Sequence, residues 1–320
     1  MDLGLLVSNL TNPTLLFFLL GIVAVRVKSD LEIPAASAKF ISLYLLFSIG
    51  FKGGVELAHS TFTPEILWSC VAGLIIASLI PAYGFFVLRK LFSVPDAAAL
   101  AAAYGSVSAV TFVAASTYLE AQGLSFSGHM VAVMAIMEAP AIIVGVTLVM
   151  LFDEESRAAV KLRDVLHHAL TNGSVLMIMG SLVIGLISDE RAAAGIKPFT
   201  TDIFKGFLAI FLLEMGLTTG NRLSSFRSHG WIAVLVGVAF PLINGAAVAA
   251  LSHIITGNPG NRFMFAVLAA SASYIAVPAA MRLAVPKADP GLYIPMALGV
   301  TFPMNITVGM PLYEWVVMMS

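Results

Sequence analysis

Ten stretches of mostly apolar residues recur along the chain, and short polar connections separate them. A helix needs about 20 apolar residues to cross the roughly 30 Å core of a bilayer. The runs are continuous, whereas the strands of a membrane barrel alternate over about 10 residues, so helices are favoured. The predicted spans are Asn12–Val27, Ala38–Gly54, Pro64–Leu88, Pro95–Leu119, His129–Phe152, Ser174–Ser188, Phe204–Gly220, Trp231–Ile255, Arg262–Val285 and Leu292–Met318.

The composition agrees with a membrane protein and excludes several other classes. Apolar and aromatic types make up 59% of the chain, charged types make up 11%, and the mean hydropathy is +0.96. Soluble domains are about 45–50% apolar and about 25% charged, and disordered chains are poorer still in apolar residues. Lys and Arg (17) only balance Asp and Glu (18), which argues against a nucleic-acid partner. The single cysteine, Cys70, permits neither an internal disulfide nor a cysteine metal cluster.

Basic residues predict the orientation of the ten spans. The odd-numbered connections hold twelve Lys and Arg, and the other side holds five. The richer side is expected in the cytoplasm, which puts both termini outside. The longest charged connection, between spans five and six, is too short for a domain.

Four sequence patterns of the first five spans return in the last five, in the same order. A repeat of this kind means that each half has a similar structure. Each half holds an odd number of spans, so the second enters the membrane with opposite polarity. The matches are Gly50 with Gly216, Pro81 with Pro241, the run from Gly105 with the run from Ala270, and Pro140 with Pro303, at offsets of 166, 160, 165 and 163.

We therefore predict an all-α polytopic membrane protein of ten transmembrane helices, built as two inverted five-helix repeats with discontinuous helices that cross at mid-membrane. Residues 1–152 form the first repeat, 153–173 a cytoplasmic linker and 174–320 the second repeat. Inverted repeats are the build of many secondary transporters, which bind their substrate near the bilayer midplane.

Spans four and nine carry the features expected of a small-anion site. Gly105 and Pro278 weaken a continuous helix, and a broken helix offers free N–H groups at a positive dipole end. Small residues that only let helices pack closely are the alternative, and the matched position in both halves favours a site. The hydroxyls that would complete it belong to Ser106, Ser108, Thr111, Ser271 and Ser273.

Glu138, in the middle of span five, is the leading candidate for binding a coupling cation. Charges inside a membrane are costly and indicate function. Its repeat counterpart is Thr301, and Asn305 follows about one turn later, so Na⁺ or H⁺ would meet oxygen ligands there. A protonated Glu138 that only locks helices together is the alternative. Lys52 and Glu214 either line an aqueous pathway or pair, with each other or with Glu138.

These segments resemble the sodium-dependent bicarbonate transporters (SbtA type) over nearly all spans. The likeness is best in SIGFKGGVELAHS, EMGLTTGNRL, GSVSAVTFVAASTYLEA, MEAPAI, AASASYIAVPAAMRLAVPKADPGLYI and TFPMNITVGMPLY. It implies a gate of spans one, two, six and seven, a core of the other spans, a homotrimer in the bacterial cell membrane, and Na⁺-coupled bicarbonate uptake. By position, the resemblance implies that the five hydroxyl residues named above face the anion or Na⁺. Glu138 occupies the position of an aspartate that forms part of the family's ion site.

The chain also departs from that family. After Ser273 the family usually has Asp, where this chain has Tyr274, which removes a charge and narrows the anion site. Lys52 replaces a small polar residue. The linker is shorter than in members that bind a soluble PII-like regulator there, which argues against that partner.

The leading hypothesis is a secondary transporter that imports a small anion, bicarbonate, together with Na⁺. Transport of another small carboxylate or a proton-coupled exchange is the alternative, and Lys52 motivates it because an ammonium group can occupy the place of a cation. An anion channel would give passive flux through a continuous pore. No set of nucleophile, base and orienting group is found in the spans, so an enzyme is not expected.

Overall fold

The computed structural model describes residues 13–153, 163, 167, 171–225 and 230–320, and these residues form helices and connections without a strand. Seven helical segments are long and apolar enough to cross a bilayer, and two shorter apolar helices accompany them. The chain is therefore a multi-pass, all-helical membrane protein. The continuous helices are α2 (Pro13–Arg26), α3 (Ala35–His59), α4 (Pro64–Leu88), α7 (His129–Phe152), α10 (Gly173–Ile187), α12 (Phe204–Ser225) and α13 (Gly230–Leu251).

Two predicted spans are interrupted in the structure, and a third changes its helical type along its length. The fourth consists of α5 (Val94–Gly105) and α6 (Ala109–Ala121), and the ninth of α14 (Pro259–Ala270) and α15 (Ala276–Ala284). The last predicted span contains short α-helical and π-helical pieces in series, and π-helical turns often mark functional regions. These pieces are α16 (Pro290–Pro295), η4 (Met296–Thr301), α17 (Phe302–Met304), η5 (Asn305–Gly309) and α18 (Met310–Met319).

The apolar pattern predicted the continuous helices well. The bounds of α4 and α7 are those predicted, whereas α3 and α12 run several residues past the predicted ends. A short helix, α11 (Glu190–Lys197), was not predicted, because it is polar and lies in a connection. Asn12 and most of the predicted linker 153–173 lie outside the described residues.

Helix α4 shows why these segments favour a membrane. Its inward residues Ile80 and Phe85 are buried, yet Trp68, Ile75 and Leu79 on its other face are more than half exposed. A helix that is apolar on all sides is stable where lipid, rather than water, covers the outward face.

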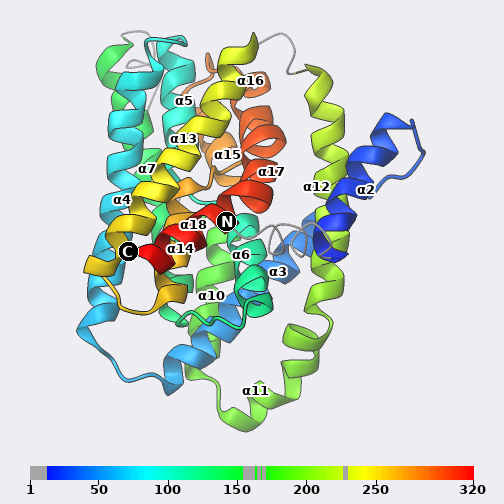
Figure 1. Cartoon of the computed structure of the whole chain (residues 1–320), viewed down its shortest axis with the longest axis vertical. Helices are drawn as coiled ribbons and strands as arrows, with labels where there is room; N and C mark the ends of the chain where they lie inside the picture. The colour runs from blue at the N-terminus through cyan, green and yellow to red at the C-terminus, as the bar shows by residue number, and fades with distance from the viewer. Residues whose placement is uncertain (1–12, 154–162, 164–166, 168–170, 226–229) are drawn as a thin grey trace.

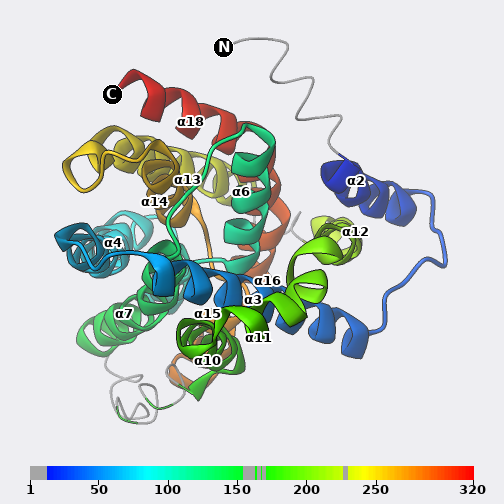
Figure 2. The same ribbon diagram turned by 90° about the horizontal axis from the view of Figure 1, so that it is seen from below.

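The helices pack in two groups. In one group α2 lies along α12 and α3 lies along α10, and α3 also contacts α12. The other group holds α4, α5 and α7 together, and α13 with α14 and α18. Figure 1 shows α2 and α12 side by side at one flank and α4 at the other. Seen from below in Figure 2, α3 runs across the middle of the molecule, where it contacts α6, α7 and α10.

Glycines allow the close helix pairs of the first group. A Cβ atom on Gly216 of α12 would lie 2.1 Å from the Phe18 carbonyl oxygen of α2. A Cβ atom on Gly54 of α3 would lie 2.1 Å from the Leu182 carbonyl oxygen of α10. Each contact is closer than any side chain allows, so the backbones approach as in the small-residue interfaces of membrane helices.

The two broken helices are anchored near their starts in the same way. Asp96, in the first turn of α5, accepts a hydrogen bond from the Asp289 N–H at 2.7 Å through its Oδ1. Asn261, in the first turn of α14, accepts one from the Ser127 N–H at 2.7 Å through its Oδ1. Each bond joins a broken helix to a connection that lies more than 130 residues away in the chain.

Candidate functional site

The breaks in α5–α6 and α14–α15 contact each other directly. The extended residues 106–108 follow α5, and residues 271–275 follow α14. The Ser108 N–H donates to the Ser271 Oγ at 3.1 Å, and the Ser273 N–H donates to the Ala103 carbonyl oxygen at 2.8 Å. Backbone groups that leave their helices are thus satisfied across the crossing, as a low-dielectric interior requires.

Small side chains shape the crossing. Gly105, the last residue of α5, has no room for a Cβ atom, which would lie 2.4 Å from the Pro81 ring of α4. Ser108 caps α6, because its Oγ accepts the Thr111 N–H at 3.1 Å. Ser106 is fully buried, and its Oγ has no partner among the described residues.

The break in the ninth span does not lie at Pro278, where the sequence led us to expect it. Helix α14 ends at Ala270, and Pro278 is the third residue of α15. Proline is tolerated in the first turn of a helix because an N–H there has no intrahelical acceptor. Residues 271–275 are held open instead by bonds to α5 and α6 and by the Ser273 Oγ, which accepts the Val277 N–H at 3.3 Å.

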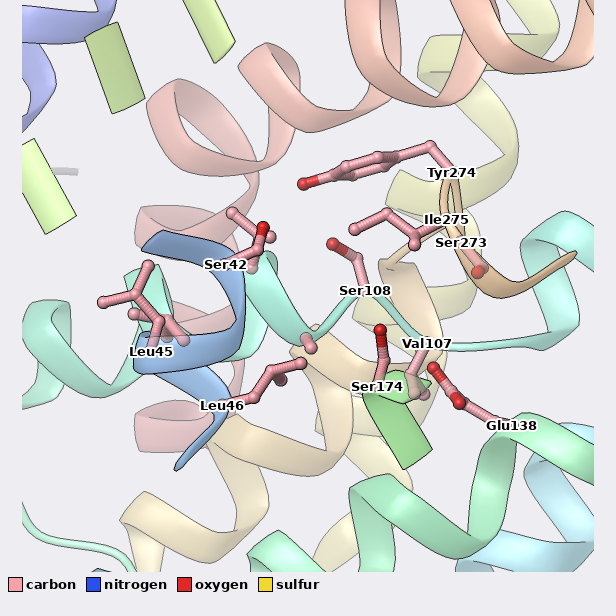
Figure 3. A pocket seen from close by; sticks show the side chains of 13 residues that line it. Ser42, Leu45, Leu46, Val107, Ser108, Glu138, Ser174, Ser273, Tyr274 and Ile275 are labelled. Carbon is pink, nitrogen blue, oxygen red and sulfur yellow. The ribbon is translucent and has the colours of Figure 1, made fainter. Parts of the chain in front are cut away.

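A small cavity adjoins the crossing (Figure 3). Its volume is about 20 Å³, which is room for about one water molecule. In Figure 3 the Ser108 and Tyr274 hydroxyls stand near each other, and the Glu138 side chain reaches toward Val107 and Ser174. The lining residues come from the two breaks, from α6 and from the unbroken helices α3, α7 and α10: Ser42, Leu45, Leu46, Val107, Ser108, Ala109, Val110, Val113, Glu138, Ser174, Ser273, Tyr274 and Ile275.

Two lining side chains have polar atoms that no described residue satisfies. Glu138 on α7 is buried, and its Oε2 has no hydrogen-bond partner among the described residues. The Tyr274 hydroxyl also has none there. A buried polar atom without a partner is costly, so both groups are suited to a bound ligand.

Thr301 and Asn305 form hydrogen bonds with residues that adjoin the two breaks. The Thr301 Oγ1 donates to the Gly237 carbonyl oxygen at 2.7 Å and lies 2.8 Å from the Tyr104 hydroxyl oxygen. The Asn305 Nδ2 donates to the carbonyl oxygen of Ala270, the last residue of α14, at 2.8 Å. Neither residue is among those that line the cavity in the described part of the chain. A shared ion site with Glu138 stays a prediction.

Of the predicted site residues, the structure brings four to the cavity wall: Ser108, Ser273, Tyr274 and Glu138. Gly105, Ser106, Thr111 and Ser271 lie in or next to the breaks without lining the cavity. Sequence reasoning missed Ser42 of α3 and Ser174 of α10. Neither lies at a break or matches a repeat pattern, so the only signal was a hydroxyl in a mostly apolar run.

A larger groove shares part of the cavity wall. Its volume is about 410 Å³, and it shares Ser42, Ser174 and Ile275 with the cavity. It extends past Lys39 at the first turns of α3 and past Glu214 of α12. A vestibule of about 120 Å³ lies at the other end of α3, beside Lys52, and shares no lining residue with the cavity.

The intramembrane charges pair differently from either predicted pairing. Lys52 lies 3.9 Å from Glu120 at the end of α6, measured from Nζ to Oε1, rather than pairing with Glu214 or Glu138. The Glu214 Oε1 accepts a hydrogen bond from the Thr218 hydroxyl at 2.8 Å. Glu214 also lines the groove, and its predicted role in an aqueous pathway or in a pair stays a prediction.

Comparison with known proteins identifies a family. The family model described as the Na⁺-dependent bicarbonate transporter superfamily matches residues 13–318 of the 320-residue chain. The match includes both breaks and Glu138. No curated protein matches the chain.

Proposed function

The chain belongs to the Na⁺-dependent bicarbonate transporter superfamily, and we propose that it imports bicarbonate together with Na⁺ by alternating access. The observation that carries this proposal is a single cavity that joins a helix N-terminus, suited to an anion, with a buried carboxylate, suited to a cation.

The N-terminus of α6 provides the anion-binding groups. The first N–H groups of a helix have no intrahelical acceptor. In α6 the Thr111 N–H is capped by Ser108 and the Phe112 N–H bonds to the Ser108 carbonyl. This leaves the N–H groups of Ala109 and Val110, and both residues line the cavity. The helix dipole adds partial positive charge there, and the Ser108 hydroxyl and Tyr274 hydroxyl complete a polar wall.

Glu138 provides the coupling. A carboxylate in the same cavity would repel an anion strongly in this low-dielectric setting. A cation on Glu138 removes that repulsion, so the anion and the cation each favour the binding of the other. The family's Na⁺ dependence supports Na⁺ as the cation, and the unsatisfied Oε2 of Glu138 supports its place in the cavity.

The grooves at the two ends of α3 support alternating access. The groove beside Lys39 is continuous with the cavity wall, and the vestibule beside Lys52 is not. The excess of Lys and Arg favours the cytoplasm as the side of Lys39. The structure would then correspond to the inward-facing end of the cycle, with the outer path closed by Leu46, Ile49 and Val113.

Paired contacts support two inverted halves. The pair α2–α12 closes on Gly216 and the pair α3–α10 closes on Gly54 and Gly50. Gly216 is the repeat counterpart of Gly50. Helix α2, the first span of the first half, packs on α12, the second span of the second half. Helix α10, the first span of the second half, packs in the same way on α3, the second span of the first half. Two such halves have two near-equivalent packings, open to opposite sides.

The test is uptake of labelled bicarbonate by the purified chain in proteoliposomes. Because CO₂ formed from bicarbonate crosses lipid and is trapped in an alkaline lumen, all uptake is compared with that of protein-free vesicles. We expect accumulation above that level with an inward Na⁺ gradient and none above it with an inward pH gradient alone. Equilibration faster than in protein-free vesicles but without accumulation would indicate a channel, and accumulation driven by pH above the protein-free level would indicate proton coupling. Competition by unlabelled acetate or formate separates bicarbonate from other small carboxylates.

Glu138→Gln tests the coupling residue in the same vesicles. The amide keeps the shape and loses the charge, so we expect the Na⁺ dependence to disappear and uptake to fall about tenfold or more. Glu190→Gln is the matched control, because Glu190 is an exposed carboxylate that pairs with His59 away from the cavity. Full retention of Na⁺ dependence in Glu138→Gln would remove this residue from the ion site.

A further inference from the structure

One carboxylate bridges the two groups of helices at the vestibule end of the molecule. Glu120 stands at the end of α6, its Oε1 lies 3.9 Å from the Lys52 Nζ of α3, and its Oε2 lies 3.4 Å from the Lys205 Nζ of α12. The two lysines thus reach the same carboxylate from two different helices. All three side chains are partly exposed, so solvent and salt can reach them.

The seam between α3 and α6 leads from this cluster to the cavity. Toward the cavity along α6 come Ser116 and then Val113, and along α3 come Ile49 and then Leu46. Ile49 and Ser116 are both buried. They separate the vestibule from the cavity, which share no lining residue. An anion that reaches the cavity from the vestibule must therefore part α6 from α3.

We propose that Glu120, Lys52 and Lys205 form an outer latch that holds this seam closed. Glu120 moves with the broken helix that carries Ser108, whereas Lys52 and Lys205 belong to the unbroken helices opposite. The latch must open before the cavity faces the vestibule. The proposed transport cycle explains why the seam would open, and in that respect this inference rests on it. The ion pairs themselves do not depend on the cycle.

The repeat supports a latch at one end only. The offset of 165 that relates spans four and nine places Val285 where Glu120 stands, and the offset of 166 places Lys39 where Lys205 stands. Val285 is buried and uncharged, so Lys39 has no equivalent carboxylate at that position. Lys39 instead lines the groove of about 410 Å³ that adjoins the cavity. The pockets at the latched end share no lining residue with the cavity, whereas the groove at the end without the carboxylate does.

The latch is expected to bias the conformational equilibrium rather than to lock it. Exposed ion pairs are individually weak, and salt screens them. Loss of both pairs is expected to shift the population of the outer-open state by about threefold to tenfold. Raised ionic strength should act in the same direction.

Cysteine labelling of the detergent-purified chain tests the latch without any assumption about membrane orientation. In a Cys70→Ser background, Ser116→Cys reports on the seam, and Leu43→Cys reports on the groove at the other end. We expect Glu120→Gln to raise the rate at which a polar maleimide modifies the cysteine at 116 by about threefold to tenfold. The same change should slow modification at 43. Ile49→Cys is a second reporter on the opposite wall of the seam.

Three comparisons make the result specific to the latch. Glu190→Gln removes another carboxylate that pairs with α3, at His59, and should leave both rates unchanged. The triple change of Glu120→Lys with Lys52→Glu and Lys205→Glu is made in a Glu56→Gln background, because Glu56 also interacts with Lys52 and Glu120. It reverses the charges of the three latch residues, and should restore slow modification at 116. High salt should speed modification at 116 in the background protein and have little effect after Glu120→Gln.

If Glu120→Gln leaves the modification rate unchanged both at residue 116 and at residue 49, the latch is overturned. Failure of the charge-reversed triple change to restore slow modification would overturn it as well. A faster rate at 116 with no slowing at 43 supports the latch and contradicts alternating access, because the two ends would then open independently.

Discussion

At the scale of single residues, the buried polar groups in and around the cavity are of two kinds. Hydroxyls such as those of Ser271 and Thr301 donate to backbone carbonyl oxygens at 2.9 and 2.7 Å and keep the crossing in shape. The Tyr274 hydroxyl and the Glu138 Oε2 have no partner among the described residues, and both belong to the cavity wall. Among the residues that line the cavity, these two unsatisfied groups are the ones best placed to bind a ligand.

Tyr274→Phe tests this distinction. Removal of the hydroxyl takes one hydrogen bond from the bound anion, and hydrogen bonds to charged groups contribute about 1.5–3 kcal/mol. We expect the KM for bicarbonate to rise about tenfold or more, with kcat nearly unchanged. The matched control is Tyr293→Phe, since Tyr293 is a buried tyrosine of α16 whose hydroxyl also lacks a described partner and which lies away from the cavity. Equal KM values for both variants would mean that Tyr274 does not contact the anion.

At the scale of helices, the contact of α12 with α2 depends on glycines, and Gly216 makes the closest approach. Gly216→Ala would place a Cβ atom 2.1 Å from the Phe18 carbonyl oxygen, so the two backbones must separate. We expect a loss of about 1–3 kcal/mol in the free energy of unfolding, measured as a lower thermal midpoint in detergent. Gly206→Ala on the same helix meets no atom within 4 Å and is expected to be neutral or slightly stabilising. A midpoint for Gly216→Ala equal to that of Gly206→Ala would contradict the close packing.

Continuous helices were predictable because apolar length alone determines a span, as α4 and α7 show. The break after Gly105 was also predictable, since glycine and serine follow one another there. The break after Ala270 was displaced from Pro278, because its position depends on hydrogen bonds to a helix about 165 residues earlier in the chain. The partner of Lys52 was missed for the same reason. Glu120 lies on another helix, and no local pattern relates the two residues.

At the scale of the whole molecule, the distribution of Lys and Arg predicts the orientation in the membrane. Phe62 and Lys90 are exposed residues in successive connections, on opposite sides of the predicted bilayer. In a Cys70→Ser background, we expect an impermeant maleimide to modify Phe62→Cys in intact cells and Lys90→Cys only after lysis. The reverse pattern would invert the assigned sides and make the groove beside Lys39 the outer one.

The hydrogen bonds between the two breaks have a consequence for selectivity. Because Ser108 is tied to Ser271 and Ser273 to Ala103, the polar backbone of the crossing is preorganised before any ligand arrives. A space of about 20 Å³ is too small for the proposed substrate bicarbonate, so we expect the opposite wall, formed by Ser42, Leu45 and Leu46, to move when the anion binds. On this proposal the crossing selects for charge and the opposite wall selects for size. Substitutions in α3 should change which anions fit without changing the sign of charge that is accepted.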